Sequence, residues 1–181
     1  MEPLLYTQYK RDVAPALKQE FGYTNIMQVP KINKIVLNVG YGRQAKDGAF
    51  IDMVEQTLQS ITGQKPVHNK TTKSISNFKI REGMDIGMSV TLRGKKMYEF
   101  LYKMIHLTLP RVRDFRGLTD KGIDRQGNYT LGFKEHIAFP EVSATGSADK
   151  IHGLQVIIAT SAKNKKEGLA LLLKMGIPFK Q

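Results

Sequence analysis

A glycine-rich turn between a predicted strand and a predicted helix is the first candidate for chemistry. The run from Gly40 to Ala45, GYGRQA, matches the GxGxx(G/A) pattern, in which glycines let a dinucleotide pyrophosphate approach a helix N-terminus. The ribose-binding carboxylate expected about 20 residues further on is absent, because residues 59–65 contain no acid. A nucleotide-dependent enzyme is therefore only an alternative, and two glycines in a tight turn account for the pattern equally well.

No other arrangement of side chains supports catalysis. The sequence contains no cysteine, which excludes disulfides and thiolate metal sites, and it lacks the GxxxxGK(S/T) and GxSxG motifs. The histidines do not have the spacing of a metal site; they are His68, His106, His136 and His152. We therefore expect no enzyme, no metal and no cofactor.

Hydrogen-bonding side chains on two predicted strands suit a different chemistry, the binding of RNA. In NKIVLNVG, Asn38 points away from the apolar face, and in GMSVTLRG the same holds for Ser89, Thr91 and Arg93. Gln64 follows a predicted helix. Short amide and hydroxyl side chains reach phosphates and 2′-hydroxyls with directional hydrogen bonds. If the two strands are neighbours, these residues form one patch on the open face of a sheet; the alternative is that each simply faces solvent.

A long basic segment, residues 64–82, lies between these strands. It has one aromatic residue, Phe78, and no acid before Glu82. Its basic residues are Lys65, Lys70, Lys73, Lys79 and Arg81. No apolar periodicity extends beyond its ends, so we predict a short strand and then an exposed loop at about 68–82 that is mobile in the free protein. Phe78 among these cations would suit stacking on a base of a second RNA.

The net charge of +12, from 28 basic and 16 acidic residues, is unevenly distributed. Residues 63–125 hold 14 basic and six acidic side chains, whereas residues 1–62 hold seven and six, and residues 126–181 hold seven and four. Such a concentration is typical of a surface that binds a polyanion, and a solvated charged face is the alternative. Only 8% of residues are aromatic, and neither NKIVLNVG nor GMSVTLRG places an aromatic on its outer face, which favours recognition of RNA shape and backbone over base reading.

The elements that position these residues mix strands with helices. Alternating apolar residues predict strands at 33–40, 87–94, 128–138 and 152–161. Helical spacing predicts helices over 3–21, divided in two by Pro15; from the N-cap Asp47 to Ile61, ended by Gly63; over 95–107, stopped by Pro110; and from the cap Asn164 to Met175. Because the strands are amphipathic, we predict an α+β fold in which helices pack on one face of an antiparallel sheet, with a single domain over residues 1–181.

Membrane association is not expected. No run of about 18 apolar residues occurs, and the N-terminal MEPLLYTQYKRD lacks the unbroken apolar stretch of a signal peptide. A basic protein bound to a membrane surface is also disfavoured, since no predicted helix combines a basic face with a bulky apolar one.

Six sequence blocks match a known family. They are ITGQKP (61–66), NFKIREGMDIG (77–87), VTLRG (90–94), LPRVRDFRGL (109–118), GNYTLGFKE (127–135) and FPE (139–141). In this order, and over nearly the whole chain, they resemble the bacterial large-subunit ribosomal protein five family.

This resemblance implies a structural constituent of the large (50S) subunit of the cytoplasmic ribosome. Proteins that look like this one bind 5S rRNA and attach it to the central protuberance, contact P-site tRNA, and form a bridge to small-subunit protein thirteen. The implied partners also include 23S rRNA and other central-protuberance proteins. The family fold, an antiparallel sheet with helices on one side, agrees with the pattern of predicted elements.

The resemblance also implies which residues contact RNA. An amide on the first strand, a glutamine in TGQKP and a threonine in VTLRG contact the 5S backbone in the family, and these match Asn38, Gln64 and Thr91. We assign Lys65, Ser89 and Arg93 to the same 5S surface. The tRNA contact of the family maps onto the long loop, where we assign Lys70, Lys73, Ser74, Phe78, Lys79 and Arg81. Residues His68, Asn69 and Thr72 depart from the family pattern, but the charge of the loop is retained.

Overall fold

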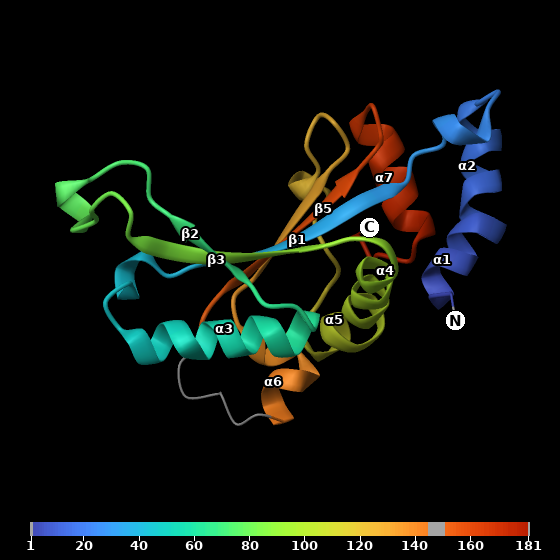
Figure 1. The fold of residues 1–181 in the computed structure, drawn as a ribbon. Coiled ribbons are helices and arrows are strands. Elements are labelled where there is room, and N and C mark those ends of the chain that lie inside the picture. The colour runs from blue at the N-terminus through green and yellow to red at the C-terminus, as the bar shows by residue number, and fades with distance from the viewer. Residues whose placement is uncertain (1, 145–150, 181) are drawn as a thin grey trace. The chain divides into compact units, whose positions relative to one another are not determined.

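Within the described residues, five strands form one sheet. The computed structural model describes residues 2–144 and 151–180, with the strand order β2-β3-β1-β5-β4 (Figure 1). The strands are β1 (Ile32–Gly40), β2 (Val67–Lys70), β3 (Asp85–Leu92), β4 (Tyr129–Phe133) and β5 (Leu154–Thr160). The predicted α+β fold, an antiparallel sheet with helices packed against it, is confirmed.

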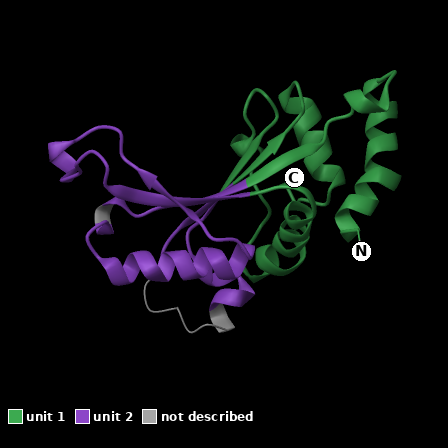
Figure 2. Ribbon diagram, viewed as in Figure 1, with its two compact units in different colours: residues 1–35, 92–131, 157–181 green, residues 36–91, 132–156 purple. Residues whose placement is uncertain are grey.

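The chain divides into two compact units, which Figure 2 shows in different colours. Unit 1 comprises residues 1–35, 92–131 and 157–181, and unit 2 comprises residues 36–91 and 132–156. Strands β1, β3, β4 and β5 each contribute residues to both units.

Unit 1 contains two helical runs that pass through a proline. The first consists of α1 (Leu4–Gln8), the π-turn η1 (Tyr9–Val13) and α2 (Ala14–Phe21). The second consists of α4 (Gly94–Lys103), the π-turn η5 (Met104–Thr108) and α5 (Leu109–Arg111). The predicted break at Pro15 was wrong in that a π-turn keeps the chain helical between α1 and α2, whereas the second run does end near Pro110, at Arg111, one residue beyond the predicted stop.

The π-turns explain how these prolines are accommodated. A proline inside an α-helix lacks an N–H donor and clashes with the carbonyl four residues before it. Each π-turn ends two residues before its proline. Ala14 N donates to Tyr9 O, and Leu109 N donates to Met104 O, both across five residues. The wider winding shifts the preceding carbonyls and keeps the chain helical.

Helix α7 (Lys165–Lys174) is the last helix of unit 1 along the chain, and the capping of its N-terminus differs from the prediction. The Asn164 side chain does not cap the helix; its Nδ2 donates to Glu167 Oε1 over 3.4 Å. Glu167 instead accepts a hydrogen bond from Lys163 N at 2.9 Å, so a carboxylate in the first turn satisfies the backbone donor. The predicted ending is confirmed, with Met175 at the C-cap and Gly176 at a φ of 90°.

Unit 2 contains the long helix α3 (Gly48–Thr62) and the short α6 (Pro140–Ala144). The predicted cap of α3 is confirmed, since the Asp47 carboxylate accepts from Phe50 N at 3.2 Å and Gly63 takes a left-handed φ of 63°. Figure 2 shows α3 running along one side of the strand segments of this unit. The core contains the buried side chains of Leu37, Val39, Phe50, Val54, Leu58, Ile61, Met88 and Val90.

The last two strands are shorter than predicted. The chain leaves β4 after Phe133, and residues 136–138 form a 3₁₀ turn, η7, in place of the predicted strand end. In this turn, His136 N donates to the backbone oxygen of His152, which lies just before β5. The remaining 3₁₀ turns are η2 (Ile26–Gln28), η3 (Gly42–Gln44), η4 (Ser76–Phe78) and η6 (Asp120–Gly122).

Candidate nucleic-acid interface

The register of β1 against β3 decides which polar side chains meet. Tyr41 N donates to Ile86 O at 2.9 Å. Continued along these antiparallel strands, this pairing places buried Leu37 opposite buried Val90, and Asn38 opposite Ser89 on the other face. The predicted neighbourhood of these two strands is therefore confirmed by the sheet order.

A row of amide and hydroxyl side chains crosses four strands on this second face. Ser89 Oγ donates to Asn69 Oδ1 across β3 and β2 at 3.2 Å, and Asn38 Nδ2 donates to Gln155 Oε1 across β1 and β5 at 3.3 Å. None of the four side chains is fully buried, so each retains lone pairs or N–H groups open to solvent. We call Asn69, Ser89, Asn38 and Gln155 the polar row.

Sequence reasoning missed two members of the polar row, Asn69 and Gln155. Gln155 lies on the strand predicted at 152–161, where alternation alone gave no reason to prefer it over other outward residues, and Asn69 falls within the loop predicted at about 68–82. The missing signal was the register between strands: Asn69 is paired with Gly87 across β2 and β3, which brings it beside Ser89.

The close approach of β1 and β3 beside the polar row requires Gly87. An added Cβ there would lie 2.9 Å from the backbone oxygen of Val39, closer than real Cβ contacts. The absence of a side chain therefore lets β1 and β3 pair tightly beside Ser89 and Asn38.

The other predicted 5S-binding residues lie on β3 or in the segments that adjoin β2 and β3. Thr91 is exposed two residues beyond Ser89 on the same face of β3, and Arg93 is exposed at the beginning of α4. Gln64 is half-buried in the connection between α3 and β2, where strand alternation does not set its direction. Its backbone is held by Thr62 Oγ1, which donates to Gln64 O and accepts from Gln64 N.

Part of the positive charge near the row is paired within the protein. Lys65 Nζ lies 3.6 Å from Glu55 Oε1 on α3, and His68 Nε2 lies 3.6 Å from the other oxygen of that carboxylate. The Lys65 side chain is 78% exposed, so it can exchange this partner for a phosphate at little cost. Burial, together with Asp85 and Glu55, raises the pKa of the neighbouring Tyr41 hydroxyl, which stays neutral.

The predicted loop after β2 is an ordered hairpin extension. Antiparallel pairing of β2 with β3 continues past a bulge between Asn69 and Lys70. Thr71 N then donates to Met84 O, and Ile75 and Ile80 exchange two backbone hydrogen bonds nearer the tip. Figure 1 shows this segment projecting beyond the strands of its own unit.

Side chains also brace the hairpin. Thr71 Oγ1 donates to Arg81 O at 2.7 Å, and Ser74 Oγ accepts from Glu82 N at 2.9 Å. Lys79 takes a left-handed φ of 54°, which turns the chain back after η4. The predicted tRNA-contacting side chains are all exposed; they are Lys70, Lys73, Ser74, Phe78, Lys79 and Arg81. Phe78 is 69% exposed, so an aromatic face is presented to solvent among cations.

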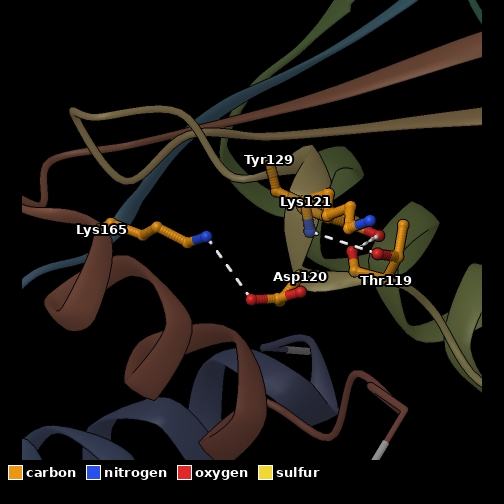
Figure 3. A network of polar contacts seen from close by, with 5 residues as sticks. All are labelled: Thr119, Asp120, Lys121, Tyr129 and Lys165. Atoms are coloured by element: carbon orange, nitrogen blue, oxygen red, sulfur yellow. Dashed lines mark hydrogen bonds and ion pairs between the residues drawn. The ribbon is translucent and has the colours of Figure 1, made fainter.

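In unit 1, a compact polar network holds the turn before β4. Figure 3 shows the Tyr129 hydroxyl donating to Thr119 O, and Lys121 N donating to Thr119 Oγ1. Burial, with a smaller effect from Asp120, raises the pKa of Tyr129 to about 12. Lys165 Nζ on α7 reaches Asp120 Oδ2 at 3.5 Å, so this lysine is also paired within the protein.

The nucleotide-binding alternative fails on the structure. The Asp47 carboxylate occupies the N-terminus of α3 by accepting from Phe50 N, where a pyrophosphate would have to bind. The strand before the turn belongs to an antiparallel sheet and not to a parallel βαβ unit. In the described part of the chain, no group of three metal-ligating side chains comes together. Over the same residues, no helix has the length and hydrophobicity needed to span a membrane.

Two family profiles match the chain in tandem. "Ribosomal protein L5" matches residues 25–81, and "ribosomal L5P family C-terminus" matches residues 85–179. The chain is 52% identical over 178 residues to the large ribosomal subunit protein uL5 of Halothermothrix orenii, covering 98% of this chain and 99% of that protein. It is 48% identical over 181 residues to uL5 of Brevibacillus brevis, covering all of both chains.

The basic α+β fold, its polar sheet face and these matches define a ribosomal protein. The chain belongs to the uL5 family of large-subunit ribosomal proteins. It is a structural constituent of the ribosome and not an enzyme.

Proposed function

We propose that this protein binds 5S rRNA through the exposed polar face of its sheet and so attaches 5S rRNA to the central protuberance. The observation that carries the proposal is the polar row with Thr91 beside it, a face of amides and hydroxyls next to a basic segment. These groups match the acceptors and 2′-hydroxyls of an RNA backbone, and the face lacks the aromatic platform that single-stranded bases need.

A single-domain organisation is part of this proposal. Three of the four strands that carry the polar row, β1, β3 and β5, have residues in unit 1 as well as unit 2. We propose one domain over residues 1–181, in which the sheet is a rigid backing for the RNA contact.

The hairpin at 70–84 has a separate role in the proposal. Its exposed lysines, Arg81 and Phe78 contact the P-site tRNA, because cations bind phosphates and one ring can stack on an exposed base. The family resemblance further supports a bridge to small-subunit protein thirteen and contacts with 23S rRNA and other central-protuberance proteins.

The 5S contact is tested by replacing Asn38, Gln64 and Thr91 with alanine and measuring filter binding of the full chain to 5S rRNA. Each lost hydrogen bond removes about 1 kcal/mol of binding free energy, so the triple variant binds up to about 100-fold more weakly. The matched control replaces Gln56, Gln59 and Ser60, which are exposed amides and a hydroxyl on α3. Equal affinity of the triple variant and this control would reject the site.

The division of labour is tested in the same assay with Lys73→Gln and Lys79→Gln combined. We expect unchanged 5S affinity and weaker binding of tRNA to large subunits that carry the variant. A parallel loss of 5S binding would show that the hairpin and the sheet face act on one RNA.

A further inference from the structure

Three arginines in unit 1 lack a side-chain partner among residues 2–144 and 151–180. Arg111, Arg113 and Arg116 lie within six residues and are all exposed. No side-chain hydrogen bond or ion pair joins any of them to another of the described residues, and the intervening Asp114 does not pair with them. Two lysines of unit 1 are paired instead: Lys174 lies 3.0 Å from Glu20, and Lys165 lies 3.5 Å from Asp120 (Figure 3).

The backbone that carries these arginines is fixed at both ends. Leu109 and Leu118, on either side of the arginine segment, are 1% and 7% exposed. Leu118 N donates to Pro178 O, and Lys180 N donates to Leu118 O, both at 2.8 Å. Gly117, at a φ of 94°, lies so close that an added Cβ would be 3.0 Å from Lys180 N. The arginines are therefore presented on an anchored segment, which lowers the entropy lost when they bind a ligand.

An exposed aromatic pair precedes the arginines on the same helical run. The rings of Tyr102 and His106 have centroids 4.4 Å apart, and Tyr102 is 38% exposed. His106 and Pro110 are also exposed. Residues four apart lie on the same side of a helix, so Tyr102, His106 and Pro110 form one exposed side that leads to the arginine segment. Aromatic residues on a soluble helix usually pack inward, as Tyr98 and Phe100 do on this helix.

We propose that unit 1 carries a second RNA-binding surface, formed by Tyr102, His106, Arg111, Arg113 and Arg116, that takes a stretch of unpaired RNA. A base splayed from its strand stacks on the Tyr102 ring, and the arginines bind the adjacent phosphates with paired N–H groups. A duplex offers no free base face to the rings, so only the arginines would contact it. The proposal is independent of the 5S site, whose residues lie in unit 2 apart from Arg93.

The surface is tested by photo-crosslinking the full chain to a thiouridine-containing oligouridylate and mapping the linked peptides by mass spectrometry. We expect a crosslink within residues 102–116. Tyr102→Leu removes the stacking ring and weakens binding at this site about tenfold, whereas Tyr102→Phe retains the ring and the affinity. Annealing the oligonucleotide to its complement abolishes the crosslink.

The arginines are tested through salt dependence. Replacing all three with glutamine lowers the slope of log affinity against log salt by about 2, because each phosphate contact on a single strand contributes about 0.7. The triple change to lysine keeps the charge and most of that slope. The 5S affinity of both triple variants stays unchanged, and the Asn38, Gln64 and Thr91 variant retains the crosslink, so failure of either site is distinguishable.

Two outcomes would overturn the proposal. Crosslinks confined to residues 64–82, with no difference between Tyr102→Leu and Tyr102→Phe, would show that this surface does not bind RNA. Unchanged RNA binding by the glutamine variant, with poor incorporation into large subunits, would assign the surface to a protein neighbour.

Discussion

At the scale of single residues, two buried histidines form the least expected contact in the molecule. The rings of His136 and His152 stack with centroids 4.0 Å apart and an interplanar angle of 4°. His136 Nδ1 accepts from His152 N, and the Phe50 ring meets His152 edge-on. In the sequence, these two histidines did not have the spacing of a metal site. In the structure neither is available for ligand binding, because they are 0% and 8% exposed.

This pair predicts a pH-dependent stability. Burial, and to a smaller extent His136, lowers the pKa of His152 to about 4, below the value of about 6.5 in an unfolded chain. Between these values the unfolded state binds more protons, so the free energy of unfolding falls as the pH falls from about 6.5 to about 4. We expect His152 to account for up to about 2 kcal/mol of the loss between pH 7 and pH 5.

Urea unfolding of His152→Phe at both pH values measures this effect. The variant keeps a ring against His136 but cannot titrate, so its stability changes less with pH than that of the unmodified protein. His106→Gln, a change at an exposed histidine, serves as the control. An identical pH response of all three proteins would contradict the assignment.

At the scale of elements, local hydrogen bonds keep the backbone regular at two helical prolines and in a segment that the sequence predicted to be a loop. Both helical prolines are accommodated by a π-turn, and the basic loop is a hairpin in which Thr71, Ser74 and the Ile75–Ile80 pair hold the two arms together. No residue between Thr71 and Ile86 is buried, so hydrophobic packing adds little to these bonds.

Because these hydrogen bonds have little hydrophobic packing behind them, we predict that the hairpin opens often in the free protein. Amide hydrogen exchange should be fast at Ile75 and Ile80 and slow at Val90 in the buried strand. Binding of the large subunit to tRNA should slow exchange at the hairpin. Protection at Ile75 equal to that at Val90 in the isolated chain would show instead that the hairpin is rigid.

At the scale of the whole molecule, strands β1, β3, β4 and β5 each have residues in both units. Melting one unit would therefore interrupt each of these strands part-way along its length. We therefore predict a single cooperative unfolding transition, as small domains commonly show.

Calorimetry and circular dichroism test this prediction together. The calorimetric and van't Hoff enthalpies should agree, and the far-ultraviolet signal should follow the same curve as the fluorescence of the buried tyrosines in unit 1. Two resolved transitions would show that the units are separate domains and would remove the rigid backing assumed for the 5S contact.

The sequence by itself determined the elements and the chemistry of their faces. Alternation at 33–40 and 87–94 separated Leu37 and Val90 from Asn38 and Ser89, because a strand directs successive side chains to opposite faces. The cap Asp47 and the stop Gly63 were local features and were read correctly. Tertiary structure alone decided the pairing of Asn69 with Ser89, the association of Asn38 with Gln155 and the stacking of His136 on His152. These contacts join residues up to 117 positions apart, and strand register and packing, which no local pattern encodes, bring them together.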